Sequence, residues 1–412
     1  MIIKNVTRTR TDLTMNYTML KEAGELAGWS KEDEALSMYQ ELNKIEDTRG
    51  KKGKRYRLAL LLTCVLLAKM AGETTLQAIA EWIRFRRTWL QEVLPETRAT
   101  FPCAATSSNV LRTVEPAHLK QVLMDLLTRV RTENRLAGEQ EHVVLDGKTL
   151  RGTQHHLPED QKKMHHLNLY EAKTGIVLKE GIVAEKANEL THLSTFLTPV
   201  LLQGRIISAD ALFTQRRFCQ DVVISGGDYL LIAKQNQPTL HEDLSLFFQD
   251  PPADCLDWRT ASTSNKGHGR LEQRVLWAST ELNDFLARDW YEVGQVFCIR
   301  RRVQHALKCT QEMVYGITSL TPKQADASRL LELNRGHWSI ENRLHYRRDG
   351  ALGEDACQVR KGSAPHVLAV LNSFVLALFD FCQVSNVKQH MRYLDASPLQ
   401  AARLLLKSLR EN

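Results

Sequence analysis

Three acidic residues stand where a divalent cation could be held. Asp146 follows the apolar run "VVL" and Asp210 follows "IISA", so each is expected where a buried strand reaches the carboxyl edge of a sheet. Ligands of α/β sheets collect at that edge. Glu341 lies within "HWSIENRLHYRRDGALGEDACQVR", residues 337–360, among several histidines and arginines. Three carboxylates from separate elements could hold two Mg²⁺ ions about 4 Å apart, which suits phosphodiester displacement.

The residue types fit this chemistry, although each position has a plainer interpretation. Mg²⁺ prefers hard oxygen ligands, and closely spaced acids repel one another unless a cation lies between them. An acid after a strand is often a helix cap or turn former, and Glu341 also suits an exposed helix with charge pairs four residues apart. The pair Glu354 and Asp355 in "GED" is an alternative source of the third ligand.

The residues around Glu341 admit a second metal hypothesis. His337, Glu341 and His345 recur at four-residue spacing and could present a zinc-binding helix face. No further ligand motif accompanies them, so the three-carboxylate site is favoured. Trp338 is interpreted as a core residue, or as a wedge against the sheet, rather than as a base-stacking platform.

Basic and amide side chains that suit DNA phosphates accompany the acids. Arginine and lysine neutralise phosphates, whereas amides fix register. Taken singly, such residues are usually solvated surface side chains. The candidates for DNA contact here are Lys148, Arg151, Lys234, Asn236, Gln237, His268, Arg270, Arg335, His337, Arg343 and Arg348.

A second basic group lies near the N-terminus. The stretch "RGKKGKRYR", Arg49–Arg57, contributes Lys51, Lys52, Lys54 and Arg55 and is typical either of nucleic-acid contact or of a solvated loop. The net charge of +7 and the pI near 8.9 suit a polyanionic partner.

Composition limits the class of protein. A chain of 412 residues favours two or three domains, and 43% hydrophobic with 25% charged residues argues against a mainly disordered chain. The eight cysteines are scattered without metal-binding spacing and are expected to be reduced. Residues 1–30 have no apolar core, which predicts no secretory signal and a cytoplasmic protein. The apolar runs Leu58–Ala68 and Val367–Cys382 fit buried helices better than membrane spans.

The order of elements predicts an α/β fold. Residues 1–135 read as a helical domain, which is either a DNA-binding head or a structural bundle. From residue 136 to 390 short strands alternate with helices, as in an α/β sheet, with a β-rich insertion at about 238–322. Residues 391–412 are predicted to form a helical tail.

Several motifs together resemble one family. In order they are "LDGKTLRGT", "EKANELTHL", "SADALFTQ", "GGDYLLIAKQNQPTL", "GHGRLEQR" and "RGHWSIENRLHYRRDGALGEDACQVRKGSAPHVLAVLN". They resemble the H-repeat-associated, ISAs-type insertion-sequence transposases of bacteria, which belong to the DDE superfamily. The stretch "EDTRGKKGKRYRL" through "TLQAIAEW" is similar to the head region associated with that family. The resemblance covers roughly residues 46–385.

The resemblance implies a catalytic site. It implies an RNase H-like mixed sheet flanked by helices, in which Asp146 in "DGK", Asp210 in "DA" and Glu341 in "HWSIEN" bind two Mg²⁺ ions, with Mn²⁺ able to substitute. His337 stands where related transposases carry an arginine, and Arg348 falls at the position of their lysine. The implied partner is double-stranded DNA, as transposon terminal inverted repeats and target, bound by a homodimer on paired ends in the nucleoid.

The sequence therefore predicts a transposase that cleaves at transposon ends and transfers the 3′-hydroxyl into target DNA. Two alternatives stay open. One is a nuclease on the same scaffold that cuts without strand transfer, and the other is a non-catalytic DNA-binding relic of a transposase. Inverted repeats flanking the coding region would favour an active mobile element.

Overall fold

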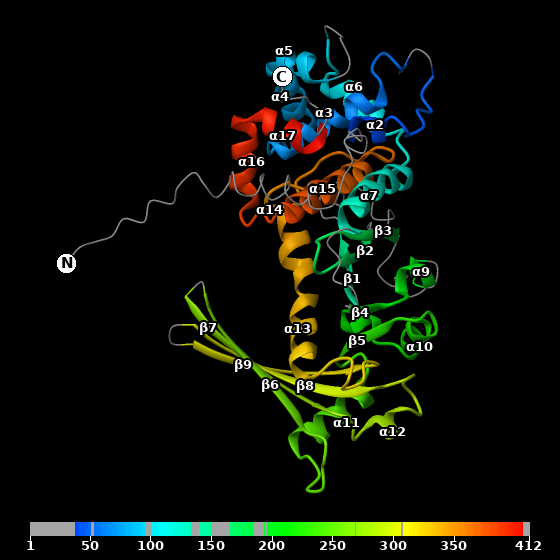
Figure 1. The fold of residues 1–412 in the computed structure, drawn as a ribbon, viewed down its shortest axis with the longest axis vertical. Coiled ribbons are helices and arrows are strands. Elements are labelled where there is room, and N and C mark those ends of the chain that lie inside the picture. Colours follow the sequence, from blue (N-terminus) through cyan, green and yellow to red (C-terminus); the bar gives the residue numbers. More distant parts are fainter. Residues whose placement is uncertain are drawn as a thin grey trace, which may run out of the picture. The chain divides into compact units, whose positions relative to one another are not determined.

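The structure is a computed structural model that describes residues 38–50, 53–94, 100–132, 140–149, 165–183, 193, 196–267, 269–305 and 308–406 (Figure 1). The chain divides into two compact units. The first contains the described parts of Met1–Ala137 and Leu344–Asn412, and the second contains those of Gly138–Leu150 and Pro158–Arg343. The two units are described separately.

The first unit is helical. Its helices are α2 (Met38–Leu42), α3 (Leu58–Met70), α4 (Leu76–Phe85), α5 (Arg87–Val93), α6 (Ala104–Leu111), α7 (Pro116–Thr132), α14 (Tyr346–Gly350), α15 (Ala364–Phe381), α16 (Val387–Ala396) and α17 (Pro398–Leu406). Helix α15 packs against α3, α6 and α7, so segments from both ends of the chain share one core. The sequence boundaries at residues 135 and 390 stay predictions.

Two apolar helices form the centre of this unit. Every residue of α3 is buried, including Thr63 and Lys69, and the rest of its sequence is apolar on all sides. In the described part of the chain, α15 is the one helix long and apolar enough to cross a membrane, and 72% of it is buried within the protein. It is therefore a core helix, as its interruption by Asn372 and Ser373 suggests.

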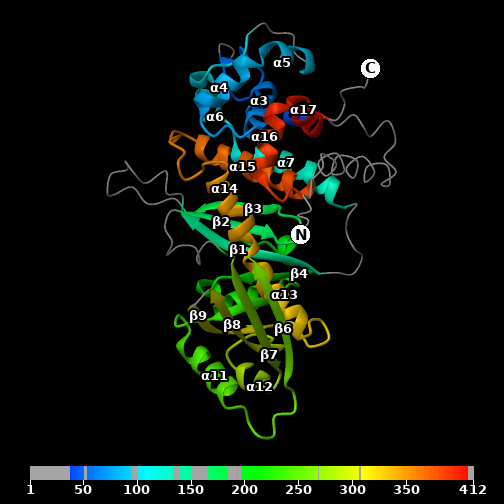
Figure 2. The ribbon, with the colours of Figure 1, turned by 90° about the vertical axis from the view of Figure 1, so that its left-hand side faces the viewer.

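The second unit is built on one nine-stranded mixed sheet, ordered β3-β2-β1-β4-β5-β9-β8-β7-β6 (Figure 2). The strands are β1 (Glu141–Thr149), β2 (His165–Glu171), β3 (Val177–Val183), β4 (Arg205–Ala209), β5 (Asp228–Ala233), β6 (Arg259–Gly267), β7 (Arg270–Ser279), β8 (Gln295–His305) and β9 (Lys308–Thr318). β1, β4 and β5 are parallel, and the other pairings are antiparallel.

Helices flank this sheet and bury both faces of its central strands, whereas β6 and the first half of β9 are largely exposed. They are α9 (Pro199–Leu202), the 3₁₀ turn η5 (Ala211–Phe213), α10 (Arg216–Ile224), α11 (Pro238–Gln249), α12 (Asn283–Leu286) and α13 (Ala327–His337). Along β4, Ile206 joins one apolar cluster and Ile207 the other, because successive strand residues point to opposite faces. Helix α13 contributes Leu330 and Leu331 to the cluster of Ile206 and contacts β1, β4, β6 and β7. The predicted α/β sheet flanked by helices is confirmed.

The segment predicted to be a β-rich insertion contains four long antiparallel strands from Arg259 to Thr318. It does not form a sheet of its own, because β9 pairs with β5 from Leu230 to Ala233. These strands therefore continue the sheet and supply backbone partners for β5, which would otherwise be an exposed edge.

Candidate metal and DNA site

The pairing of β1 with β4 places Asp146 and Asp210 side by side. The parallel register ends at the pair Leu145 and Ala209. Asp146 is the next residue of β1, and Asp210 follows the last residue of β4 as the N-cap of η5. Adjacent strands lie about 4.8 Å apart and registered residues share a face, so both carboxylates emerge together at the carboxyl end of this ladder. β1 itself continues to Thr149, paired with β2, so Asp146 lies within the strand rather than at its end.

The loop after β4 is held by side-chain hydrogen bonds. Asp210 Oδ1 accepts a hydrogen bond from the backbone N–H of Ala211 at 2.7 Å. Asn236 Nδ2 donates to the carbonyl oxygen of Ala211 at 2.5 Å, and Gln237 Nε2 donates to that of Thr214 at 2.9 Å. Two residues that the sequence singled out for DNA contact therefore also fix the backbone that carries Asp210.

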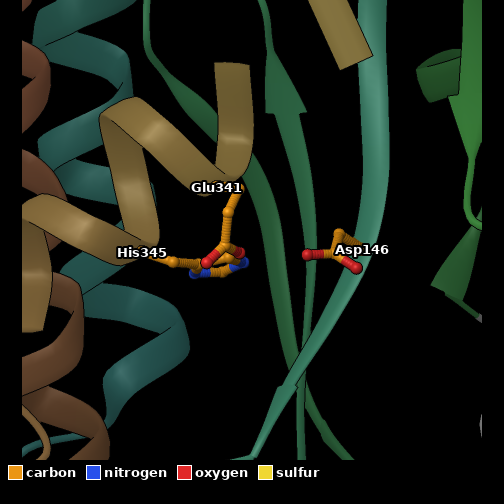
Figure 3. Close-up of side chains that lie close together, drawn as sticks. All are labelled: Asp146, Glu341 and His345. Atoms are coloured by element: carbon orange, nitrogen blue, oxygen red, sulfur yellow. The ribbon is translucent and has the colours of Figure 1, made fainter. Parts of the chain in front are cut away.

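Glu341 belongs to η6 (Ile340–His345), a π-helical segment that follows α13. Such segments are rare and frequently occur at functional sites. One carboxylate oxygen of Glu341 and one of Asp146 lie within 4.8 Å of each other. His345, in the same segment, offers a ring nitrogen within 4.8 Å of the Glu341 oxygen. Figure 3 shows the Glu341 carboxylate beside the His345 ring, with Asp146 on β1 directed toward Glu341.

The donor set fits a hard divalent cation. Asp146 is half-buried and Glu341 is exposed, so water and a phosphate oxygen have access to any ion between them. Two carboxylates this close repel each other unless a cation lies between them. Asp210 is not part of this group, and its Oδ1 lies 3.7 Å from Lys234 Nζ in an exposed ion pair. The three predicted ligands are therefore divided between a close pair and a neighbouring aspartate.

One serine hydroxyl connects the three elements that carry the acids. His142 Nε2 on β1 lies 2.8 Å from Ser208 Oγ on β4. His337 Nδ1, at the end of α13, lies 3.1 Å from the same oxygen. Helix α13 approaches β1 closely at Gly336, where a Cβ atom would lie 2.8 Å from His142 Nδ1. The Ser208 hydroxyl therefore links three elements a few residues before their acids in the chain. These elements are β1, which carries Asp146, β4, which precedes Asp210, and α13, which precedes Glu341.

The electrostatics of this link follow from burial. Burial lowers the pKa of His142 to about 3, and the positive charges of His337 and Arg329 act in the same direction. Burial also lowers the pKa of His337, whereas the carboxylates of Asp146 and Asp210 oppose that shift. Because a neutral imidazole has one N–H and one acceptor nitrogen, the serine can donate to one ring and accept from the other.

Sequence reasoning missed His142 and Ser208. The visible signals were weak: one histidine before "VVLD" and one polar residue inside the apolar strand "IISAD". Neither shows a role until the strands and α13 are brought together.

The other candidates for DNA contact are scattered. Lys51, Lys52, Arg151 and His268 lie outside the described residues, as does the side chain of Lys148. Lys54 and Arg55 are exposed, and the Arg55 guanidinium lies over the Tyr56 ring at 5.6 Å. Arg343 Nη1 donates to the carbonyl oxygen of Ala172 at 3.0 Å and so anchors η6 to the turn after β2. Arg270 and Arg335 belong to an arginine cluster described below.

The first unit holds two residues that sequence reasoning had linked to the site. Arg348 Nε lies 2.7 Å from Glu354 Oε2, and their side chains are 1% and 7% exposed. Asn372 Nδ2 donates to Glu354 Oε1 at 3.2 Å. A guanidinium buried in this way offers no surface to a DNA phosphate, and Glu354 is committed to a structural ion pair. Neither residue is retained in the proposed site.

The expectation for Trp338 is corrected by the structure. Its side chain is 57% exposed rather than part of the core. Trp338 terminates α13 as the C-cap, where the change to η6 begins, so its side chain leaves the face that packs on the sheet. The alternative zinc face of His337, Glu341 and His345 is not formed, since His337 contacts Ser208 while Glu341 and His345 approach Asp146.

Two family models match this chain. The family described as "Transposase DDE domain" matches residues 137–378, and the family described as "DDE_Tnp_1-associated" matches residues 39–127. The matched DDE region contains Asp146, Asp210 and Glu341. The chain therefore belongs to the DDE transposase family.

The individual relatives share less than a third of their aligned residues with this chain. An uncharacterized protein in the dhlA 3′ region of Xanthobacter autotrophicus is 29% identical over 269 residues, which cover 61% of this chain and 88% of that protein. A protein of Escherichia coli O157:H7 provisionally named as transposase YncI is 24% identical, covering 84% of this chain and 88% of that protein. The H repeat-associated protein YhhI of Escherichia coli (strain K12), also provisionally named as a transposase, is 24% identical, with coverage of 82% and 88%.

Proposed function

We propose that this protein cleaves DNA at transposon ends and transfers the resulting 3′-hydroxyl into target DNA. The observation that carries the proposal is the approach of the Asp146 and Glu341 carboxylates to within 4.8 Å, inside the region matched by the transposase domain. We further propose that strands β3-β2-β1-β4-β5 form an RNase H-like core, and that β6 to β9 are the insertion that precedes Glu341.

Asp146, Asp210 and Glu341 would hold two Mg²⁺ ions, with Mn²⁺ able to substitute. Asp146 and Glu341 would share one ion, and Asp146 with Asp210 the other. The exposed contact of Lys234 with Asp210 is weak enough to yield, because such pairs contribute at most about 1 kcal/mol. When bound, the ions would supply Lewis-acid stabilisation of the displaced oxygens and an activated water.

The chain itself supplies positioning and charge. The hydroxyl of Ser208 would hold β1, β4 and α13 together, and so would position the elements that carry the three acids. Lys148, Arg151, Lys234, His268, Arg270, Arg335 and Arg343 are proposed to contact DNA near the acids, with Lys51, Lys52, Lys54 and Arg55 contacting it on the helical head. No protein nucleophile is required. A homodimer on paired ends, located at the nucleoid, completes the proposal.

The direct test is cleavage and strand transfer on DNA carrying the element's own terminal repeats, with Mg²⁺ or Mn²⁺. Asp146→Ala, Asp210→Ala and Glu341→Ala are expected to abolish both reactions. Glu332→Ala, an exposed glutamate on α13 paired with Arg329, is the matched control and should retain both. Cutting without joining would indicate the nuclease alternative, and binding without cutting would indicate the DNA-binding relic.

A further inference from the structure

An arginine cluster lies on the face of the insertion strands that α13 covers. Arg274 on β7 stands directly opposite Arg301 on β8, so the two side chains share that face. Both guanidinium groups contact one carboxylate, Glu272, with Arg274 Nη2 at 2.8 Å from Glu272 Oε1 and Arg301 Nε also within hydrogen-bond distance of Oε1. Arg270 Nη2 lies 4.0 Å from the other oxygen, Oε2.

Helix α13 brings a fourth arginine to this cluster. The positive charges of Arg335 and Arg301 both lower the pKa of Arg274, although burial is the largest cause of the shift and the Glu272 carboxylate opposes it. Arg335 Nη2 also donates to the side-chain oxygen of Asn265 at 3.0 Å, in the amide orientation that satisfies both amide atoms. Asn265 is the cross-strand partner of Glu272, so Arg335 joins the cluster on the same face.

The cluster has more positive than negative charge. Arg270, Arg274, Arg301 and Arg335 carry four positive charges against two negative charges, those of Glu272 and of Glu312, whose Oε2 lies 3.6 Å from Arg301 Nη1. An ion-pair network that served only to join strands would gain most from equal numbers of each charge. Here the buried Glu272 carboxylate holds several guanidinium groups together while leaving their summed charge at +2, which suits an additional anion.

We propose that Arg274, Arg301 and Arg335, arranged around Glu272, bind a backbone phosphate of the DNA substrate. The inference rests on the proposed function and deepens it, because it assigns Arg274, Arg301 and Glu272 to the DNA contact of the same site. Guanidinium forks match phosphate oxygens, whereas a row of arginines without base-reading side chains confers no sequence preference.

The cluster lies near the acids in the chain but is separate from them. Arg335 on α13 precedes Glu341 by six residues, and the C-cap Trp338 stands between the two. The phosphate that we assign to the cluster is therefore not the phosphate being cut. The contact would therefore position the substrate rather than take part in the chemistry.

The test measures DNA affinity without catalysis. Fluorescence anisotropy with a labelled duplex carrying the element's terminal repeats is recorded in EDTA between about 50 and 200 mM KCl. Arg301→Gln should weaken binding and lower the slope of log affinity against log salt by about 1. Arg274→Gln with Arg301→Gln should weaken binding further without a larger change of slope, because the cluster neutralises one phosphate. Arg217→Gln on α10, which removes an exposed arginine paired with Asp221, should leave affinity and slope unchanged.

A second measurement locates the phosphate. Backbone phosphates on either side of the cleavage position are replaced one at a time with uncharged methylphosphonates. At one of these positions the replacement should weaken DNA binding by the wild-type protein and cause no further loss of affinity in Arg301→Gln. Arg301 is the more exposed of the two substituted arginines, so this variant decides the outcome even if the double variant does not fold.

The possible failures are distinguishable. The arginine cluster is structural only, and the inference is overturned, if folded Arg301→Gln keeps the wild-type DNA affinity and salt slope. The same conclusion follows if every methylphosphonate weakens DNA binding by Arg301→Gln as much as it weakens binding by the wild type. If the wild-type protein binds no DNA at all, the proposed function fails first.

Discussion

Glu341 and Glu354 come from one basic stretch of sequence yet occupy opposite environments. Glu341 is exposed, and its carboxylate approaches another acid, Asp146. Glu354 is buried, and its carboxylate is matched by Arg348 and Asn372. The first arrangement is electrostatically incomplete without a cation, whereas the second is satisfied within the protein.

The difference indicates a functional role for Glu341 and a structural role for Glu354. A carboxylate that faces another carboxylate costs stability, and such placements persist where a ligand or reaction needs them. A buried ion pair with further hydrogen bonds satisfies its own charges, and losing one partner leaves the other uncompensated. Substitutions at the two glutamates should therefore have opposite signatures.

The largest effect is expected at the close acid pair. Glu341→Gln should reduce cleavage by about 10³-fold or more, since it removes a ligand for ions that stabilise the displaced oxygens. The same change removes repulsion of Asp146, so the free energy of unfolding without metal should stay constant or rise slightly. Single-turnover cleavage measures the first effect, and urea denaturation in EDTA measures the second. A clear loss of stability in Glu341→Gln would contradict the contrast between Glu341 and Glu354.

The buried pair should behave in the opposite way. Glu354→Ala should lower the free energy of unfolding by about 3–5 kcal/mol, because Arg348 keeps a buried charge without its partner. Replacing both residues, as Arg348→Met with Glu354→Leu, should recover most of that loss. Chemical denaturation of the two variants provides the measurement. If the double replacement lowers the free energy of unfolding as much as Glu354→Ala does, the uncompensated charge of Arg348 is not the cause of the loss.

Acid pH should weaken the second unit through His142. Its folded pKa of about 3 lies below the ordinary value of 6.5, so the unfolded chain binds the extra proton between those two values. The stability that the neutral His142 contributes is fully present above pH 6.5 and is lost as the pH falls toward 3. This loss is at most a few kcal/mol. Denaturation midpoints of the wild type and His142→Gln, compared from neutral to acid pH, should converge as pH falls.

A smaller effect is expected at the shared hydroxyl. Ser208→Ala removes the link between His142 and His337 and should cost about 1–2 kcal/mol of stability. If the hydroxyl positions the acids, the variant should also bind Mn²⁺ more weakly, and Ser208→Thr should restore binding. Mn²⁺ titration by electron paramagnetic resonance follows this directly. Unchanged Mn²⁺ affinity in Ser208→Ala would limit Ser208 to packing.

Sequence patterns were sufficient for the local features of this protein. The apolar runs before Asp146 and Asp210 specify strands, because β-branched and aliphatic side chains there must be buried on both faces of a sheet. The apolar residues of α3 and α15 specify core helices in the same way. The motifs around the three acids also indicated the transposase family that comparison shows.

Only the tertiary structure decided which polar side chains face solvent and which face one another. Nothing in the local sequence distinguishes Arg348 from Arg335, yet Arg348 is buried against Glu354 whereas Arg335 is exposed beside Arg274. Likewise, His142, Ser208 and His337 are distant in sequence and meet only because β1, β4 and α13 pack together. Helix and strand formation depend on neighbouring residues, whereas the burial and pairing of a charge depend on segments that the fold brings from elsewhere in the chain.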